Sequence, residues 1–159
     1  MSKKNFIKTI LLTIFSVTLF TSNCAAQKNF TKLNIPKVVN TDSIFKNPYY
    51  DKLIVAISKV ESGGNPKAVN PSGKYVGYLQ IGNVVVKDCN RLIGENRYTS
   101  QDRYSIEKSI EMFKIIQSHY NPTNDIEKAI RTWNGGSGYK IKSTQGYYNK
   151  VINHYNNPK

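Results

Sequence analysis

The chain has 159 residues and carries 23 Lys and Arg against 10 Asp and Glu, a formal charge of +13 at pH 7. About 110 residues remain beyond the N-terminal segments described below, which is enough for one domain with one core and excludes a second. The chain holds two cysteines, and N-terminal processing would leave Cys89 alone, which excludes an intramolecular disulfide framework.

The first 26 residues are typical of an export signal. A basic start is followed by an apolar stretch from Phe6 to Phe20 and then by Cys24-Ala25-Ala26-Gln27. Two routes of processing are open, cleavage after Ala26 or lipidation of Cys24 with membrane anchoring, and Asn23 fits lipidation poorly. An uncleaved anchor is a third alternative. We therefore expect an exported protein in the periplasm or outer envelope, secreted or lipid-anchored.

Residues 27–47 lack sustained hydrophobic periodicity and are predicted to be a spacer, so that the folded domain covers residues 48–156. Removal of the signal with Lys3, Lys4 and Lys8 would lower the net charge from +13 to +10. For an exported protein the anionic partners are cell-wall polymers, phospholipid headgroups and lipopolysaccharide, and nucleic acid is not expected. Because the lysines are scattered, a solubilising surface charge carries about equal weight.

The first expected helix, about residues 49–61, ends on a carboxylate. Ile54, Ile57 and Glu61 share one face of it, and Gly63 can take the positive φ that ends a helix. Apolar neighbours and the negative end of the helix dipole both disfavour the charged carboxylate, so Glu61 could act as a general acid near neutrality. A solvent-facing glutamate in a frayed last turn is the alternative.

Three further long helices and one short one follow from apolar residues at the helical period. The short helix covers about residues 83–92 and places Cys89 in the core, and a central, buried helix covers about residues 103–119. The third runs from an Asn124 cap to Trp133, with Glu127 in a capping box, and the last covers about residues 145–156. Strand signals are weak, with at most a short hairpin near residues 74–81. The predicted fold class is mainly α, a single domain with several helices and at most a small β-hairpin.

Four short motifs occur in a particular order along the domain. They are Glu61-Ser62-Gly63-Gly64-Asn65, Gly77-Tyr78-Leu79-Gln80, Trp133-Asn134-Gly135-Gly136 and Thr144-Gln145-Gly146-Tyr147. Their order and spacing resemble the lytic transglycosylases of the lysozyme-like superfamily, of the soluble lytic transglycosylase type. In that family Glu-Ser, Gly-Leu-Met-Gln, Tyr-Asn-Ala-Gly and Thr-x-x-Tyr follow one another. The resemblance runs from about Pro48 to Tyr155 and implies a lysozyme-like fold.

The resemblance also implies roles for single residues. Glu61 matches the catalytic acid and base, Gln80 a substrate-contacting glutamine, Asn134 the asparagine lining the cleft, and Tyr147 a tyrosine close to the catalytic carboxylate. Apart from the resemblance, other roles are open for three of these residues. Gln80 could form hydrogen bonds within its loop, Asn134 could cap a helix, and Tyr147 could be a core residue.

Two aromatic residues depart from the family pattern, since Tyr78 stands where the family has Leu and Trp133 where it has Tyr. Leu79 stands where the family has Met, and Gly135 where it has Ala. These four departures put the details of the sugar-binding subsites in doubt, and they do not affect the expected reaction. Tyr78 and Trp133 are candidates for lining the substrate groove, with core packing as the equal alternative.

The implied reaction needs one carboxylate, whereas most glycosidases use two. Glu61 would protonate the glycosidic oxygen, the substrate's N-acetyl group would stabilise the cation, and Glu61 would then take a proton from the 6-hydroxyl. The expected function is cleavage of peptidoglycan between N-acetylmuramic acid and N-acetylglucosamine, leaving 1,6-anhydromuramyl ends. A hydrolytic muramidase, an inactive wall-glycan-binding module and a cationic envelope-disrupting protein are the alternatives.

No cofactor or metal is expected, because His119 and His154 lie on separate helices without metal-ligand spacing. The expected partners are peptidoglycan glycan strands and, depending on the role of the enzyme, a secretion or conjugation apparatus. We expect a monomer.

Overall fold

The structure, a computed structural model, describes residues 41–158. The elements in chain order are α2 (Thr41–Lys46), η1 (Pro48–Tyr50), α3 (Asp51–Ser62), β1 (Tyr75–Val76), β2 (Ile81–Gly82), α4 (Asn83–Ile93), η2 (Ser100–Tyr104), α5 (Ile106–Tyr120), α6 (Ile126–Gly135) and α7 (Ile141–Asn156). The prediction of a mainly α fold with a small hairpin is confirmed. The predicted export signal, Cys24 and the spacer up to residue 40 lie outside the described residues.

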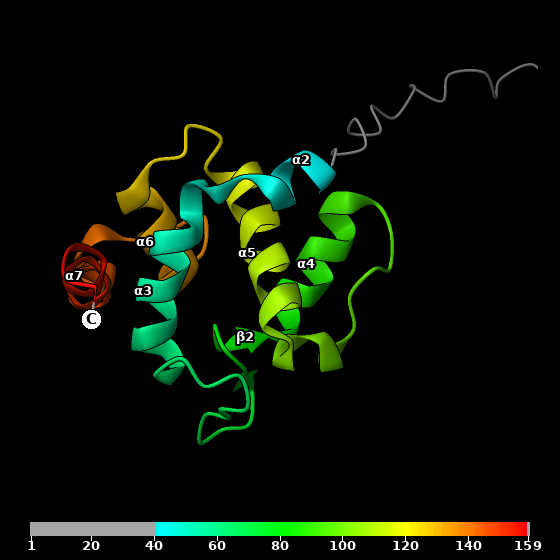
Figure 1. The fold of residues 1–159 in the computed structure, drawn as a ribbon, viewed down its shortest axis with the longest axis horizontal. Helices are drawn as coiled ribbons and strands as arrows, with labels where there is room; N and C mark the ends of the chain where they lie inside the picture. The colour runs from blue at the N-terminus through cyan, green and yellow to red at the C-terminus, as the bar shows by residue number, and fades with distance from the viewer. Residues whose placement is uncertain (1–40, 159) are drawn as a thin grey trace, which may run out of the picture. The chain divides into compact units, whose positions relative to one another are not determined.

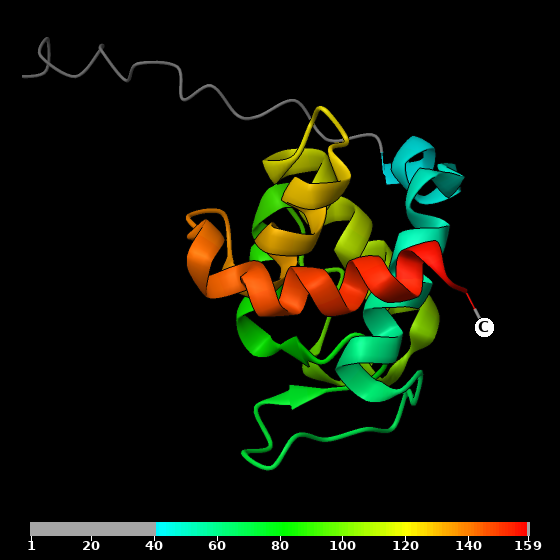
Figure 2. The same cartoon turned by 90° about the vertical axis from the view of Figure 1, so that its left-hand side faces the viewer.

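Helix α5 is the centre of the domain. Figure 1 shows it between α4 on one side and α3 with α6 on the other. Figure 2 shows α7 crossing α3 and α6, the two helices with which it makes most of its contacts. Met112, Phe113 and Ile115 of α5 are at most 1% exposed, so this helix supplies the middle of the core. This agrees with the central, buried helix predicted there, and the exception among its apolar residues is Ile106 at the start, which is 43% exposed.

The short hairpin β1–β2 lies at the end of the long loop that follows α3. Its strands are antiparallel, with Tyr75 opposite Gly82 and Val76 opposite Ile81. The buried guanidinium of Arg103 in η2 donates to the carbonyl oxygens of Lys74 and Ile81, both at 3.2 Å. A side chain from η2 therefore fixes a hairpin too short to be stable through its own ladder.

Helix α2 occupies the end of the segment that the sequence predicted to be a spacer. It is held by the buried Lys114 of α5, whose Nζ donates to the carbonyl oxygens of Phe45 and Asn47 at 3.1 and 2.8 Å. The same Nζ lies 3.1 Å from a carboxylate oxygen of Asp51. Because the anchor comes from a distant helix, hydrophobic periodicity within α2 gave no sign of it.

Helix α6 begins one residue later than predicted, because its N-cap is Asp125 and not Asn124. The Asn124 side chain instead accepts a hydrogen bond from the Tyr50 hydroxyl at 3.0 Å. The predicted capping box is absent as well, since Glu127 pairs with Arg131 at 2.7 Å. Asn124 is thus taken by a tertiary contact and Glu127 by an i,i+4 pair within α6, which leaves the cap to the adjacent aspartate.

Cys89 is fully buried in α4, as predicted, and burial raises the pKa of its thiol to about 12. This thiol is therefore protonated at neutral pH and is a packing group. None of the helices within residues 41–158 has the length and apolar character needed to cross a membrane.

We predict that Gly77→Ala strongly destabilises the domain. Gly77 has a φ of +82°, and a Cβ there would clash with the backbone carbonyl oxygen of Arg103. The combined backbone strain and overpacking should lower the free energy of unfolding by about 3 kcal/mol or more. Gly73 is the matched control, because its φ is +69° and nothing lies within 4 Å of its Cβ position. Gly73→Ala should cost only about 1–2 kcal/mol, and equal losses in urea unfolding would contradict this account.

Candidate active site

Glu61 lies in the last turn of α3, where an inward-facing stripe reaches the surface. Ile54 and Ile57 on that stripe are at most 1% exposed, whereas Glu61 is half-buried. Gly63 caps the helix with a left-handed φ of 65°, which turns the chain away immediately after the carboxylate. The carboxyl group is therefore sheltered by the core on one side and accessible on the other.

A hydrogen bond from α7 determines the environment of this carboxyl group. The Tyr147 hydroxyl donates to Glu61 Oε1 at 2.6 Å. Burial raises the pKa of Glu61 above its ordinary value, and the hydrogen bond from Tyr147 partly offsets the rise. Burial and the adjacent Glu61 raise the pKa of Tyr147, so the phenol stays protonated and remains the donor. The pair provides a carboxyl group that keeps its proton to higher pH than an exposed glutamate does.

Arg131 of α6 holds the first turns of α7 in the position that Tyr147 requires. Its guanidinium is 3% exposed and donates to the Ile141 carbonyl oxygen, to Thr144 Oγ1 and to Gln145 Oε1 at 3.1, 3.0 and 2.9 Å. These contacts explain why α7 begins at residue 141, four residues before the predicted start. The sequence 141–144 has no apolar stripe, and its helical turn is stabilised by this arginine instead.

The loop after α3 is tied back to the helix beside Glu61. Ser62 Oγ donates to the Tyr78 carbonyl oxygen at 2.8 Å. Gln80, at a φ of 49°, turns its amide inward, and its Nε2 donates to the carbonyl oxygens of Gly77 and Ala68 at 3.0 and 3.3 Å. The Gln80 nitrogen thus braces the loop, which leaves its carbonyl oxygen for any contact with substrate.

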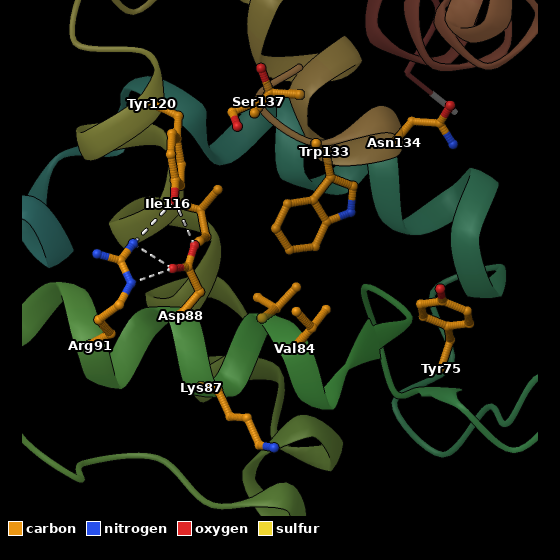
Figure 3. Close-up of a pocket in the computed structure, with 13 residues that line it drawn as sticks. Tyr75, Val84, Lys87, Asp88, Arg91, Ile116, Tyr120, Trp133, Asn134 and Ser137 are labelled. Atoms are coloured by element: carbon orange, nitrogen blue, oxygen red, sulfur yellow. Dashed lines mark hydrogen bonds and ion pairs between the residues drawn. The ribbon is translucent and has the colours of Figure 1, made fainter. Parts of the chain in front are cut away.

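A groove of about 610 Å³, here called the α4–α6 groove, lies between these two helices over α5 (Figure 3). Its lining residues are Tyr75 of β1; Val84, Val85, Lys87, Asp88 and Arg91 of α4; Ile116 and Tyr120 of α5; Thr132, Trp133 and Asn134 of α6; and Gly136 and Ser137 beyond α6. Its size is within the range of ligand-binding clefts. The hairpin that carries Tyr75 connects it to the end of α3 that carries Glu61, because Tyr78 between the two strands accepts the hydrogen bond from Ser62.

Of the residues singled out in the sequence, Trp133 and Asn134 line this groove, and Glu61 and Tyr147 meet at the end of α3. Tyr78 and Gln80 belong to the loop between them and are not among the lining residues. Trp133 also packs against Phe113, with ring centroids 4.9 Å apart, so it serves both the core and the groove.

Close packing explains Gly135, one of the departures from the family pattern. A Cβ there would lie 2.8 Å from Tyr139 Cβ and 2.9 Å from Thr144 Cγ2. The end of α6 therefore approaches the start of α7 more closely than an alanine would allow.

The sequence did not predict a role for two exposed residues of the groove, Tyr75 and Val84. Tyr75 is 48% exposed and Val84 is 72% exposed. A sequence signal for Val84 exists, because three consecutive valines at residues 84–86 put an apolar side chain on the polar face of an amphipathic helix. Tyr75 lies in a hairpin whose strands have two residues each, too short for a strand pattern.

No second carboxyl group joins Glu61 among residues 41–158. The better-buried acids are engaged elsewhere, Glu111 with Tyr98 and Lys108, and Asp88 with Arg91 and Tyr120. In the same part of the chain no group of three His, Cys, Asp or Glu side chains could hold a metal ion. Glu61 is thus the carboxyl group that this end of α3 presents, with Tyr147 as its hydrogen-bond donor.

Residues 45–156 match the transglycosylase SLT domain family. No curated protein and no solved structure matches the chain. The match covers every element from the end of α2 to the end of α7, and so contains both the Glu61–Tyr147 pair and the α4–α6 groove.

We predict that Tyr147→Phe raises the pKa of Glu61 further. The substitution removes a hydrogen bond that favours the ionised carboxylate and leaves the burial that disfavours it. Titration of the carboxyl carbon by NMR measures this directly. Tyr148→Phe is the matched control. The Tyr148 ring centroid lies 4.5 Å from the guanidinium carbon of Arg131, and phenylalanine keeps this ring. A Glu61 pKa unchanged by Tyr147→Phe would contradict the assigned hydrogen bond.

We also predict that Glu61→Gln raises the melting temperature at about pH 7. Because the folded-state pKa of Glu61 is raised, ionisation costs stability as the pH rises through that pKa. The neutral amide avoids this cost and can still accept the hydrogen bond from Tyr147. The gain should shrink as the pH falls from the raised pKa towards the ordinary glutamate pKa of about 4.3, and it should be absent below that pH. Thermal unfolding across this pH range tests the sign, and a gain that persists in acid would exclude ionisation as its cause.

Proposed function

The chain belongs to the transglycosylase SLT domain family, and from this membership we propose that Glu61 is its catalytic acid and base. The family supports a lytic transglycosylase-type function that acts on peptidoglycan. The specific reaction proposed is cleavage of the bond between N-acetylmuramic acid and N-acetylglucosamine, with formation of a 1,6-anhydromuramyl end. The single observation that carries this proposal is the half-buried Glu61 carboxyl group with its hydrogen bond from Tyr147.

The reaction begins with Glu61 in its protonated form, which burial favours. The carboxyl group donates its proton to the glycosidic oxygen, the bond to the anomeric carbon breaks, and the leaving sugar departs with a free hydroxyl group. The N-acetyl group of the substrate stabilises the positive charge that develops at the anomeric carbon. A second protein carboxylate is not needed for this step, in contrast to most glycosidases.

In the second step the 6-hydroxyl of the muramyl residue attacks the anomeric carbon and closes the anhydro ring. Glu61, now ionised, accepts the proton of that hydroxyl and returns to its starting form. Tyr147 acts as a positioning residue, because its hydrogen bond holds one carboxylate oxygen while the other remains available for proton exchange. The hydrogen bond also stabilises the ionised form between the two steps.

The proposed place of action is the cell envelope. Export rests on the N-terminal signal, with Ala26 cleavage and Cys24 lipidation as the two routes, and the net positive charge suits an anionic wall. Peptidoglycan glycan strands are the proposed substrate, and a secretion or conjugation apparatus is the proposed partner where the wall must be opened locally.

The test is mass spectrometry of the fragments released from purified peptidoglycan. We expect anhydromuropeptides from the wild-type protein and a loss of about 10²- to 10⁴-fold in rate for Glu61→Gln. Glu107→Gln is the matched control, since Glu107 is an exposed glutamate on α5, and it should keep the wild-type rate.

Reducing ends in place of anhydro ends would favour the hydrolytic muramidase. Undiminished release by Glu61→Gln would contradict the assignment of the catalytic residue. Binding of wall glycans without any release would identify a binding module, and activity that disappears only at high salt would indicate a cationic protein that acts through charge.

A further inference from the structure

Tyr75 is a groove residue whose ring lies against Gly82. It opens β1 directly opposite Gly82, and a Cβ at Gly82 would lie 3.1 Å from Tyr75 Cε1 and 3.3 Å from Cδ1. The ring therefore packs against the backbone of Gly82, where a larger residue would displace it. The side chain is nevertheless 48% exposed. An aromatic ring held in place with its remaining surface open is a platform for a ligand.

The platform continues along the α4–α6 groove. Val84 starts the α4 wall beside Gly82 and is 72% exposed, while Trp133 extends from the α6 wall into the space above α4 (Figure 3). Asn134, exposed at the end of α6, lies on the same side of the groove as Tyr75 in that view. This part of the groove thus offers aromatic and apolar surfaces together with one amide, which can donate and accept hydrogen bonds.

Two of the three charged residues that line the groove pair with each other. At the end away from Tyr75, Asp88 accepts hydrogen bonds from Arg91 at 2.6 Å and from the Tyr120 hydroxyl at 2.9 Å. Lys87, the other charged residue of the lining, extends away from the groove in Figure 3. The part of the groove around Tyr75 therefore suits an uncharged ligand with apolar faces and polar edges.

Sugar rings have this character, because their C–H faces are apolar and their hydroxyl and N-acetyl groups lie around the edge. We propose that Tyr75 is a substrate-binding residue that stacks against a sugar ring of the glycan strand, with Gly82 required to seat its ring. The inference rests on the proposed function for the identity of the ligand. The hairpin links this platform to the catalytic residue, since Tyr78 of the same hairpin is tied to Ser62, the neighbour of Glu61.

The test measures binding of a β-1,4-linked N-acetylglucosamine oligomer by isothermal titration calorimetry. All variants carry Glu61→Gln, so that turnover does not interfere. Tyr75→Ala should weaken binding about 3- to 10-fold, the amount expected for one aromatic contact, and Tyr75→Phe should bind as tightly as the parent. Gly82→Ala should also weaken binding, although Tyr75 is still present, because the added Cβ displaces the ring.

Tyr49→Ala is the matched control, because Tyr49 is 49% exposed and lies on η1, outside the α4–α6 groove. It should leave the affinity unchanged. Full affinity in Tyr75→Ala, equal losses in Tyr75→Ala and Tyr49→Ala, or no binding by the parent would each overturn the proposal. A binding loss in Tyr75→Ala together with undiminished peptidoglycan cleavage by Glu61→Gln would leave the stacking role intact and remove the proposed catalytic role of Glu61.

Discussion

The hydrogen bond from Tyr147 to Glu61 joins the end of α3 to α7 across 86 positions of the chain, and the rest of the site depends on it. Helix α7, which supplies Tyr147, packs across α3 and α6, and the buried Arg131 holds its first turns. On the other side of Glu61, the contact between Ser62 and Tyr78 attaches the loop that carries the hairpin. One carboxyl group is thus positioned by three separate parts of the chain.

The energetics of Glu61 explain how a single carboxyl group could serve both steps of the proposed reaction. Burial alone would favour the proton so strongly that the group became a poor base, and exposure alone would leave it ionised and a poor acid. The Glu61 carboxyl group, which is buried and accepts one hydrogen bond, lies between these limits. No positively charged partner compensates its ionisation among residues 41–158, where burial and Tyr147 are the two influences on its pKa. The domain accepts a local loss of stability at the position where the chemistry is proposed.

The sequence predicted the features that local patterns encode. Helical periodicity placed Glu61 at the end of an inward-facing stripe, and the order of four motifs indicated the family and the pairing of Glu61 with Tyr147. Prediction from local patterns failed where a side chain from another element determines the structure. Lys114 anchors α2, and Arg131 extends the start of α7. Tyr50 binds the Asn124 side chain, which therefore does not cap α6. Tyr75 was missed because a platform arises only when the hairpin brings the ring onto Gly82. The roles predicted for Gln80 and Asn134 in substrate binding remain predictions.

The measurement that tests the central claim most directly is the pH dependence of kcat/KM on isolated glycan strands, for the wild type and for Tyr147→Phe. The alkaline limb of the wild-type profile should fall at the pKa of Glu61 measured independently by NMR, because the first step requires the protonated carboxyl group. In Tyr147→Phe this limb should move to higher pH together with that pKa. An alkaline limb that does not follow the Glu61 pKa in both proteins would contradict the assignment of Glu61 as the acid and base.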